Sequence, residues 1–210
     1  MTRKISFDSE YQLHKLTQKH LRKLFDLKCV ASEIQLNNLR LDNLAFDEKT
    51  DTFVIIEYKN DLNLNVLNQA QEYHDLLLKN KEFFLERLND DVKVDFKNTR
   101  IMIIGPEFSE NQIRDSEDNY ELWKITLFDD GEVIYENLKT GEIKNINIDL
   151  DELKLTEETL LKDKPPEIKE LYFNLKKNVL DEFSDVDIKY LVNQFSFRVN
   201  DNLICVITFL

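Results

Sequence analysis

Apolar residues near the start of the chain follow first helical and then strand-like spacing. Five of them between positions 13 and 25 lie on one face of a helix, which Asp8 or Ser9 can cap and for which Gln12 completes a capping box. Three segments rich in β-forming residues come next, at 29–36, 39–46 and 53–59. The pattern predicts one helix followed by a three-stranded meander.

Helical spacing returns at residues 65–88, which contain no glycine or proline. A short, continuously apolar strand follows at residues 100–104. The order of helix, three strands, helix and strand indicates an α/β fold of the α+β kind with a mixed sheet. Beyond it, two strands at 122–128 and 132–135 flank a hairpin turn, and a third near 143–148 extends or flanks the sheet.

A domain boundary is predicted in the acidic segment 149–166, because its closing Pro165-Pro166 pair breaks regular structure. Residues 1–148 would form the main domain. Residues 167–210 indicate a helix and a hairpin that are too small to bury a core alone. Because the last strand is apolar and its edge is unprotected, we expect this tail to pair with a second copy or to pack onto residues 120–148.

The apolar runs are all far shorter than a membrane-spanning helix, and the first residues lack the features of a signal peptide. We therefore expect a cytoplasmic protein. The two cysteines, Cys29 and Cys205, each lie in an apolar run, which favours reduced buried thiols over a disulfide or a metal site.

The formal net charge of −13 argues against a nucleic-acid partner, but its distribution changes that conclusion. Residues 1–100 hold 16 Lys and Arg against 17 Asp and Glu, whereas residues 101–210 hold 12 against 24. Within the first 28 residues there are seven basic and three acidic side chains. A DNA-facing surface in the first half is compatible with this pattern, and so is an ordinary solvated helix face.

The predicted hairpin brings charged residues together. If its turn is centred between positions 49 and 50, facing residues have numbers that sum to 99. Asp42 then faces Glu57 and Arg40 faces Lys59, all on one face because side chains alternate along a strand. Facing carboxylates repel unless a cation lies between them, and carboxylate oxygens with water suit Mg²⁺ or Mn²⁺. The hairpin thus predicts a divalent-metal site.

These residues resemble a known signature. Leu41-Asp42, then fourteen residues, then Glu57-Tyr58-Lys59 resembles that of the PD-(D/E)XK nuclease superfamily, and the predicted element order resembles its restriction-endonuclease-like αβββαβ core. Residues 5–130 are similar more narrowly to prokaryotic NucS-like and RecB-like nuclease domains. The tail from residue 167 resembles the start of a small module appended to such domains, some of them labelled predicted transport proteins.

The resemblance implies an endonuclease that hydrolyses DNA phosphodiester bonds with Mg²⁺ or Mn²⁺. Asp42 and Glu57 would bind the metal and Lys59 would assist catalysis, while Gln69 and Tyr73 on the following helix would border the site.

Two further acidic residues and one substitution qualify this resemblance. Leu41 replaces the proline of the signature, at a position that holds a turn and not a ligand. Glu10 has the place in the element order of an acidic residue that often joins the metal site, although the helix dipole also favours an acid there. Glu33 projects either toward the site or toward solvent.

Three interpretations stay open at this level. The first is the metal-dependent endonuclease. The second is a catalytically silent module of nuclease fold that binds nucleic acid or protein, with the acidic second half contacting a partner. The third is an ordinary α/β domain in which Arg40, Asp42, Glu57 and Lys59 form only a salt-bridge network.

Overall fold

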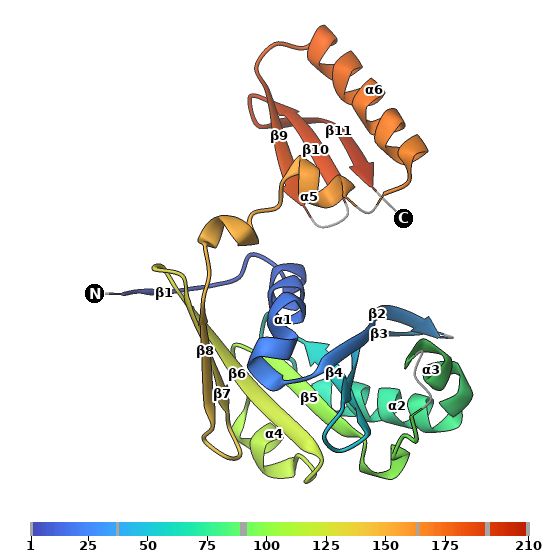
Figure 1. Cartoon of the computed structure of the whole chain (residues 1–210). Helices are drawn as coiled ribbons and strands as arrows, with labels where there is room; N and C mark the ends of the chain where they lie inside the picture. The colour runs from blue at the N-terminus through green and yellow to red at the C-terminus, as the bar shows by residue number, and fades with distance from the viewer. Residues whose placement is uncertain (1, 37, 89–91, 163, 192–193, 209–210) are drawn as a thin grey trace. The chain divides into compact units, whose positions relative to one another are not determined.

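The structure, a computed structural model, describes residues 2–36, 38–88, 92–162, 164–191 and 194–208 (Figure 1). It divides into two compact units, Met1–Glu152 and Leu153–Leu210. Each unit has its own sheet and its own apolar core, so each is described by itself.

The first unit begins with the predicted helix, α1 (Glu10–Phe25). Ser9 is its N-cap, and its side chain accepts a hydrogen bond from the backbone N–H of Gln12 at 3.3 Å. Asp26 ends the helix in a left-handed conformation, with its backbone N–H bonded to the carbonyl of Arg22. The helix and its cap are as the sequence predicts.

The described residues of this unit form a mixed sheet of eight strands. Its order is β2 (Lys28–Leu36), β3 (Leu39–Asp47), β4 (Thr52–Tyr58), β5 (Arg100–Gly105), β6 (Tyr120–Phe128), β7 (Glu132–Asn137) and β8 (Ile143–Asn147), and β1 (Lys4–Ile5) pairs with β6. The pairs β4–β5 and β5–β6 are parallel, and the other pairs are antiparallel. The predicted fold class and the αβββαβ order are confirmed, while β1 was not predicted.

Helices cover both faces of the sheet. On one face Ile55 of β4 and Ile103 of β5 pack with α2 (Val66–Lys79) and α3 (Lys81–Leu88). On the other, Tyr58 contacts His14 and Trp123 contacts Phe25, both of α1. The one-residue alternation of a strand therefore decides which helix each side chain meets. None of the described helices is long and apolar enough to cross a membrane.

The single helix predicted for residues 65–88 is two helices. Helix α2 ends at Asn80, whose backbone leaves the helical conformation at ψ 41°. The side chain of Asn80 donates to the carbonyl of Leu76 at 2.7 Å. An asparagine that bonds to a nearby carbonyl competes with continued helix in this way. Two short helices that were not predicted, η1 (Phe96–Asn98) and α4 (Glu110–Asp115), flank β5.

The second unit is larger than the predicted helix and hairpin. It contains α5 (Glu157–Leu161), α6 (Pro166–Glu182) and an antiparallel sheet in the order β11 (Asn202–Thr208), β10 (Gln194–Val199) and β9 (Val186–Leu191). The side chains of Leu160, Leu161, Tyr172, Val179, Phe195 and Phe197 form its buried core. The segment 149–166 is therefore not a plain linker, because η2 (Leu150–Leu153) and α5 lie in it. The predicted ends at positions 193 and 209–210 lie outside the described residues.

The cysteines differ from the expectation of buried thiols. Both are free, Cys29 is exposed and Cys205 is partly exposed. Cys29 lies on the outer strand β2 at a register shift between Cys29 and Ala31, where the side chain is not forced inward.

Candidate active site

The β3–β4 hairpin has the predicted register. Leu44 pairs with Ile55, and the regular ladder stops one pair further on, at Asn43 and Ile56. Asp42 and Glu57 are the next residues of the two strands, on the face that α2 covers. The backbone N–H of Tyr58 donates to Oδ2 of Asp42 at 3.0 Å, which holds the two strands together where their ladder ends.

Glu57 is a buried carboxylate with only half of its hydrogen-bonding capacity used. Its side chain is 1% exposed, and its Oε1 accepts from Nζ of Lys59 at 2.6 Å. The other oxygen, Oε2, is buried and has no hydrogen-bond partner in the described residues. Burial above all, and next the charge of Asp42, raise the pKa of Glu57 to about 8, although Lys59 opposes the shift.

Asp42 is half-buried and shares this environment. Burial raises its pKa, and the hydrogen bond from Tyr58 and the charge of Lys59 only partly compensate. Two neighbouring carboxylates whose pKa values are both raised form a site whose negative charge Lys59 only partly offsets. Such a site favours a cation.

Lys59 links the carboxylates to α1. Its side chain is 12% exposed and its Nζ lies 3.9 Å from Oε2 of Glu10, on the first turn of α1. Burial raises the pKa of Glu10, against the effect of Lys59. The backbone N–H of Lys59 donates to the carbonyl of Ile104 at 3.0 Å. Strands β4 and β5 thus fix the position of the lysine.

Tyr73 of α2 lies near the carboxylates, and Gln69 of the same helix is its hydrogen-bond partner. The hydroxyl of Tyr73 donates to the carbonyl of Arg40 at 2.5 Å and accepts from Nε2 of Gln69 at 2.8 Å. Burial raises the pKa of Tyr73, and so do the charges of Glu57 and Asp42. Tyr73 is therefore close enough to interact with the carboxylates, and Gln69 is hydrogen-bonded to Tyr73.

Arg40 and Glu33 pair with each other at the outer side of the site. Nη2 of Arg40 lies 2.8 Å from Oε1 of Glu33, and both side chains are about half exposed. Glu33 has a positive φ of 53° at its place in β2. Arg40 also interacts electrostatically with Asp42, while Lys59 interacts with Glu10, Asp42 and Glu57.

A buried polar group lies directly behind the carboxylates, on the α1 face. The hydroxyl of Tyr58 donates to Oδ1 of Asn43 at 2.7 Å, and the ring of His14 stacks on that of Tyr58 with centroids 4.8 Å apart. Burial lowers the pKa of His14 to about 4, so its ring is neutral. Sequence reasoning missed Tyr58 and Asn43, although each directly follows a proposed metal ligand, and it gave His14 no role.

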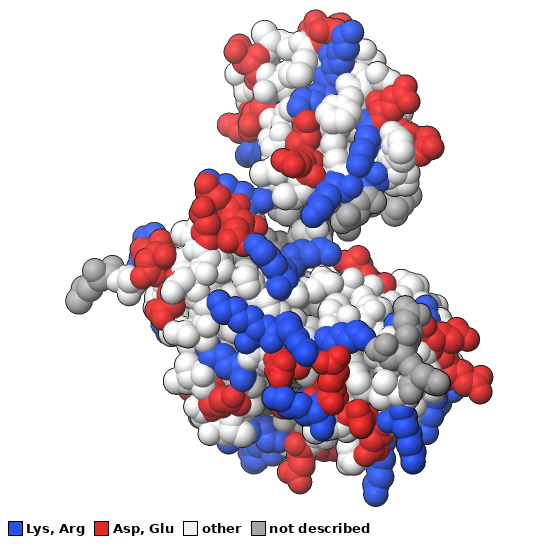
Figure 2. Space-filling model, in the orientation of Figure 1, with Lys and Arg blue, Asp and Glu red and all other residues white. Residues whose placement is uncertain are grey.

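The basic end of the chain lies on α1. Figure 2 shows lysine and arginine side chains gathered over this helix, with acidic groups among them. Arg22 pairs with Glu48 at 2.7 Å, and Lys19 pairs with Glu152. This surface is therefore partly neutralised by the protein itself.

The donor set fits a hard divalent cation that takes few protein ligands. No group of three histidine, cysteine, aspartate or glutamate side chains is arranged for metal binding within the described residues. Mg²⁺ is commonly held by one or two carboxylates and completes its shell with water and phosphate oxygens. Asp42 and the unpartnered Oε2 of Glu57 meet that requirement.

Comparisons with known proteins place the chain only distantly. No protein-family model matches it. It is 29% identical over 221 residues to an uncharacterized protein of Haemophilus influenzae, covering 94% of this chain and 72% of that protein.

Two solved structures are similar in part. The EndoMS–dsDNA2 complex is 15% identical over 57% of this chain, and a repair endonuclease from Pyrococcus abyssi is 18% identical over 56%. The TM-score is 0.41 in both cases, and this chain spans 46% of either one's length. So low a score over so partial an overlap does not establish an activity or a family for this chain.

Proposed function

We propose that the protein is a divalent-metal-dependent endonuclease that hydrolyses phosphodiester bonds of DNA. The observation that carries the proposal is the buried, unpartnered Oε2 of Glu57 beside Asp42. A buried carboxylate oxygen without a donor is costly, and a cation bound between the two carboxylates would remove that cost.

Each side chain of the site has a distinct role in this proposal. Asp42 and Glu57 would hold Mg²⁺ or Mn²⁺, which when bound activates water and neutralises charge on the leaving oxygen. Lys59 has a backbone held by Ile104 and an ammonium 2.6 Å from Oε1 of Glu57. It would donate to the attacking water or to the scissile phosphate, where a positive charge stabilises the negative charge that develops. The backbone N–H of Tyr58 donates a hydrogen bond to Asp42 and so fixes the orientation of that carboxylate.

Incubation of plasmid and branched DNA with Mg²⁺, Mn²⁺ or EDTA tests the activity. We expect cleavage with either metal, none in EDTA and none by Asp42→Asn. Asp51→Asn is the matched control, because Asp51 is an exposed aspartate in the turn of the same hairpin. Equal cleavage with metal and EDTA, or by wild type and Asp42→Asn, would show that another site or a contaminant is responsible.

A further inference from the structure

We propose that a second subsite beside the carboxylates binds a backbone phosphate of the DNA strand, in a cavity of about 240 Å³ that Lys124 lines. The inference rests on the proposed function and adds to it where the substrate strand lies. The cavity shares a sheet end with the site already described.

The cavity lies where β6 changes its pairing partner. Lys124 of β6 pairs with Gly105 at the end of β5, and Leu127 pairs with Ile5 of β1. Residues of both regions line the cavity, together with Asn60, which directly follows Lys59. It therefore opens at the carboxyl ends of the parallel strands β4 and β5, where ligands of open α/β sheets bind.

Lys124 lies on the same face of the sheet as Lys59 and in the same row, that is, at the same level along the strands. The parallel register pairs Tyr58 with Ile104, so the next positions are Lys59 and Gly105, and Gly105 pairs with Lys124. Two strand spacings put the backbones of β4 and β6 roughly 10 Å apart. Because successive phosphates of a DNA strand are farther apart than the axial rise of roughly 3.4 Å, the two lysines suit two different phosphates of one strand.

Close packing favours a glycine between the two lysines. A Cβ at Gly105 would lie 3.2 Å from the carbonyl oxygen of Lys59 and 3.8 Å from the ring of Phe108. The absence of a side chain there lets Lys59 approach β5.

The lining has the chemistry of a phosphate site. Its polar side chains are those of Lys4, Ser6, Asn60, Lys124 and Thr126, with one carboxylate, Glu107. Within the part of the chain that the structure describes, neither Lys4 nor Lys124 takes part in an ion pair or a side-chain hydrogen bond. Glu136 of β7 lies opposite Lys124 in the antiparallel pair of β6 and β7, but the two side chains form no ion pair. In a chain with a net charge of −13, two lysines without partners are available for an anion.

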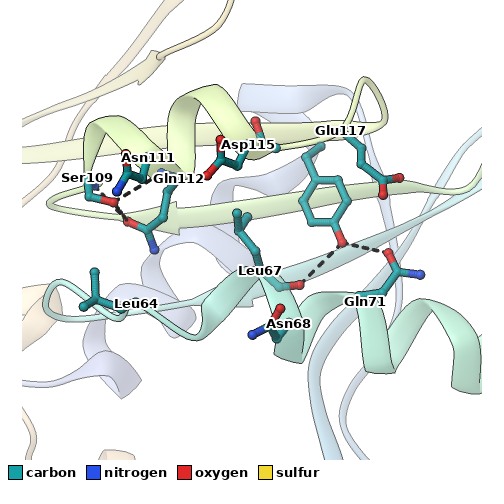
Figure 3. A pocket seen from close by; sticks show the side chains of 11 residues that line it. Leu64, Leu67, Asn68, Gln71, Ser109, Asn111, Gln112, Asp115 and Glu117 are labelled. Carbon is teal, nitrogen blue, oxygen red and sulfur yellow. Dashed lines mark hydrogen bonds between the residues drawn. The ribbon is translucent and has the colours of Figure 1, made fainter.

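The larger cavity of the same unit has the opposite character. It has a volume of about 540 Å³ and lies between α2 and α4 (Figure 3). Its lining includes Asp115 and Glu117 but no lysine or arginine, and Gln71 and Gln112 are hydrogen-bonded within the protein. The sign of its charge disfavours a phosphate, in contrast to the lysines that line the cavity at Lys124.

Fluorescence anisotropy with a labelled DNA duplex, on the full chain in EDTA over a salt series, tests the subsite. Lys124→Gln is expected to reduce the slope of log K against log salt by about 0.9, the effect of one lost phosphate contact. In Mg²⁺ the same variant should raise KM for cleavage several-fold and leave kcat near the wild-type value. Lys4→Gln, at an exposed position of β1, should act in the same direction.

Lys79→Gln is the matched control, since Lys79 is an exposed lysine at the far end of α2, about 15 Å from Gln69 along the helix axis. A wild-type slope for Lys124→Gln and Lys4→Gln would overturn the subsite. A further outcome is that inorganic phosphate stabilises the wild type and not Lys124→Gln while both proteins have the same DNA slope. That result would also overturn the subsite, because Lys124 would then bind free phosphate and not DNA. Lack of cleavage by the wild type would refute the proposed function, whereas the subsite depends on the binding slopes alone.

Discussion

Replacing Glu57 by glutamine should stabilise the metal-free protein at neutral and alkaline pH. The pKa of Glu57 is about 8 in the folded chain against an ordinary value of 4.5, so its protonated form is favoured by folding. That contribution is complete below about pH 4.5 and is lost as the pH rises through 8. Glutamine is uncharged at every pH and still presents an acceptor to Lys59.

The size of the effect follows from the interval between the two pKa values. At about 1.36 kcal/mol per pH unit, the interval from 4.5 to about 8 corresponds to on the order of 5 kcal/mol as an upper value. The opposing effect of Lys59 is already contained in the pKa of about 8. We expect Glu57→Gln and wild type to be equally stable near pH 4.5 and to differ by about 2–4 kcal/mol at pH 9.

Urea unfolding in EDTA at a series of pH values measures this difference. The single tryptophan, Trp123, is buried in the first unit, so its fluorescence reports the unfolding of the unit that contains Glu57. Glu72→Gln, an exposed glutamate of α2, is the control and should follow the wild-type curve. A loss of about 3 kcal/mol or more for Glu57→Gln at neutral pH would refute the reasoning, because it is the expected result for a broken buried salt bridge.

Three further predictions concern the metal and the two units. Affinity for Mn²⁺ should rise about tenfold per pH unit up to about pH 8, because binding releases one proton from Glu57. Calorimetry in buffers of different ionisation enthalpy measures that proton, and its absence would place the metal at another site. Tyr58→Phe and Tyr135→Phe each remove a buried hydroxyl that bonds to Asn43 or Thr17, and each should cost about 1–3 kcal/mol. Only Tyr58→Phe should weaken Mn²⁺ binding, and equal affinities would make the Tyr58 bond purely structural. A fragment ending at Glu152 should unfold cooperatively and bind Mn²⁺ like the full chain, unless the second unit is needed to fold the first.

The carboxylate pair could be predicted because a hairpin is a local structure. A short turn sets the register of its two strands, and alternation then decides which side chains share a face. The observed pairing of Leu44 with Ile55 agrees with that arithmetic. Asp42 and Glu57 follow from it without knowledge of any other part of the chain.

Elements that depend on distant partners were missed. Strand β1 has two residues and exists because Lys4 and Ile5 pair with Phe128 and Leu127. Strand β9 and helix α5 were likewise missed, since their formation depends on the shared core of the second unit. Short elements carry too little periodicity to be recognised without those contacts.

The sequence by itself determined the order of the principal helices and strands, the register of the β3–β4 hairpin and the placement of Asp42 and Glu57 on one face just beyond its last pair. These features depend on residues that are close along the chain. Only the tertiary structure decided that Glu57 is buried with one oxygen unpartnered, that His14 and Asn43 support Tyr58, and that Lys124 lies in the row of Lys59. Burial and electrostatic environment depend on what covers a face and which strands adjoin it, and those neighbours come from segments far apart in the sequence.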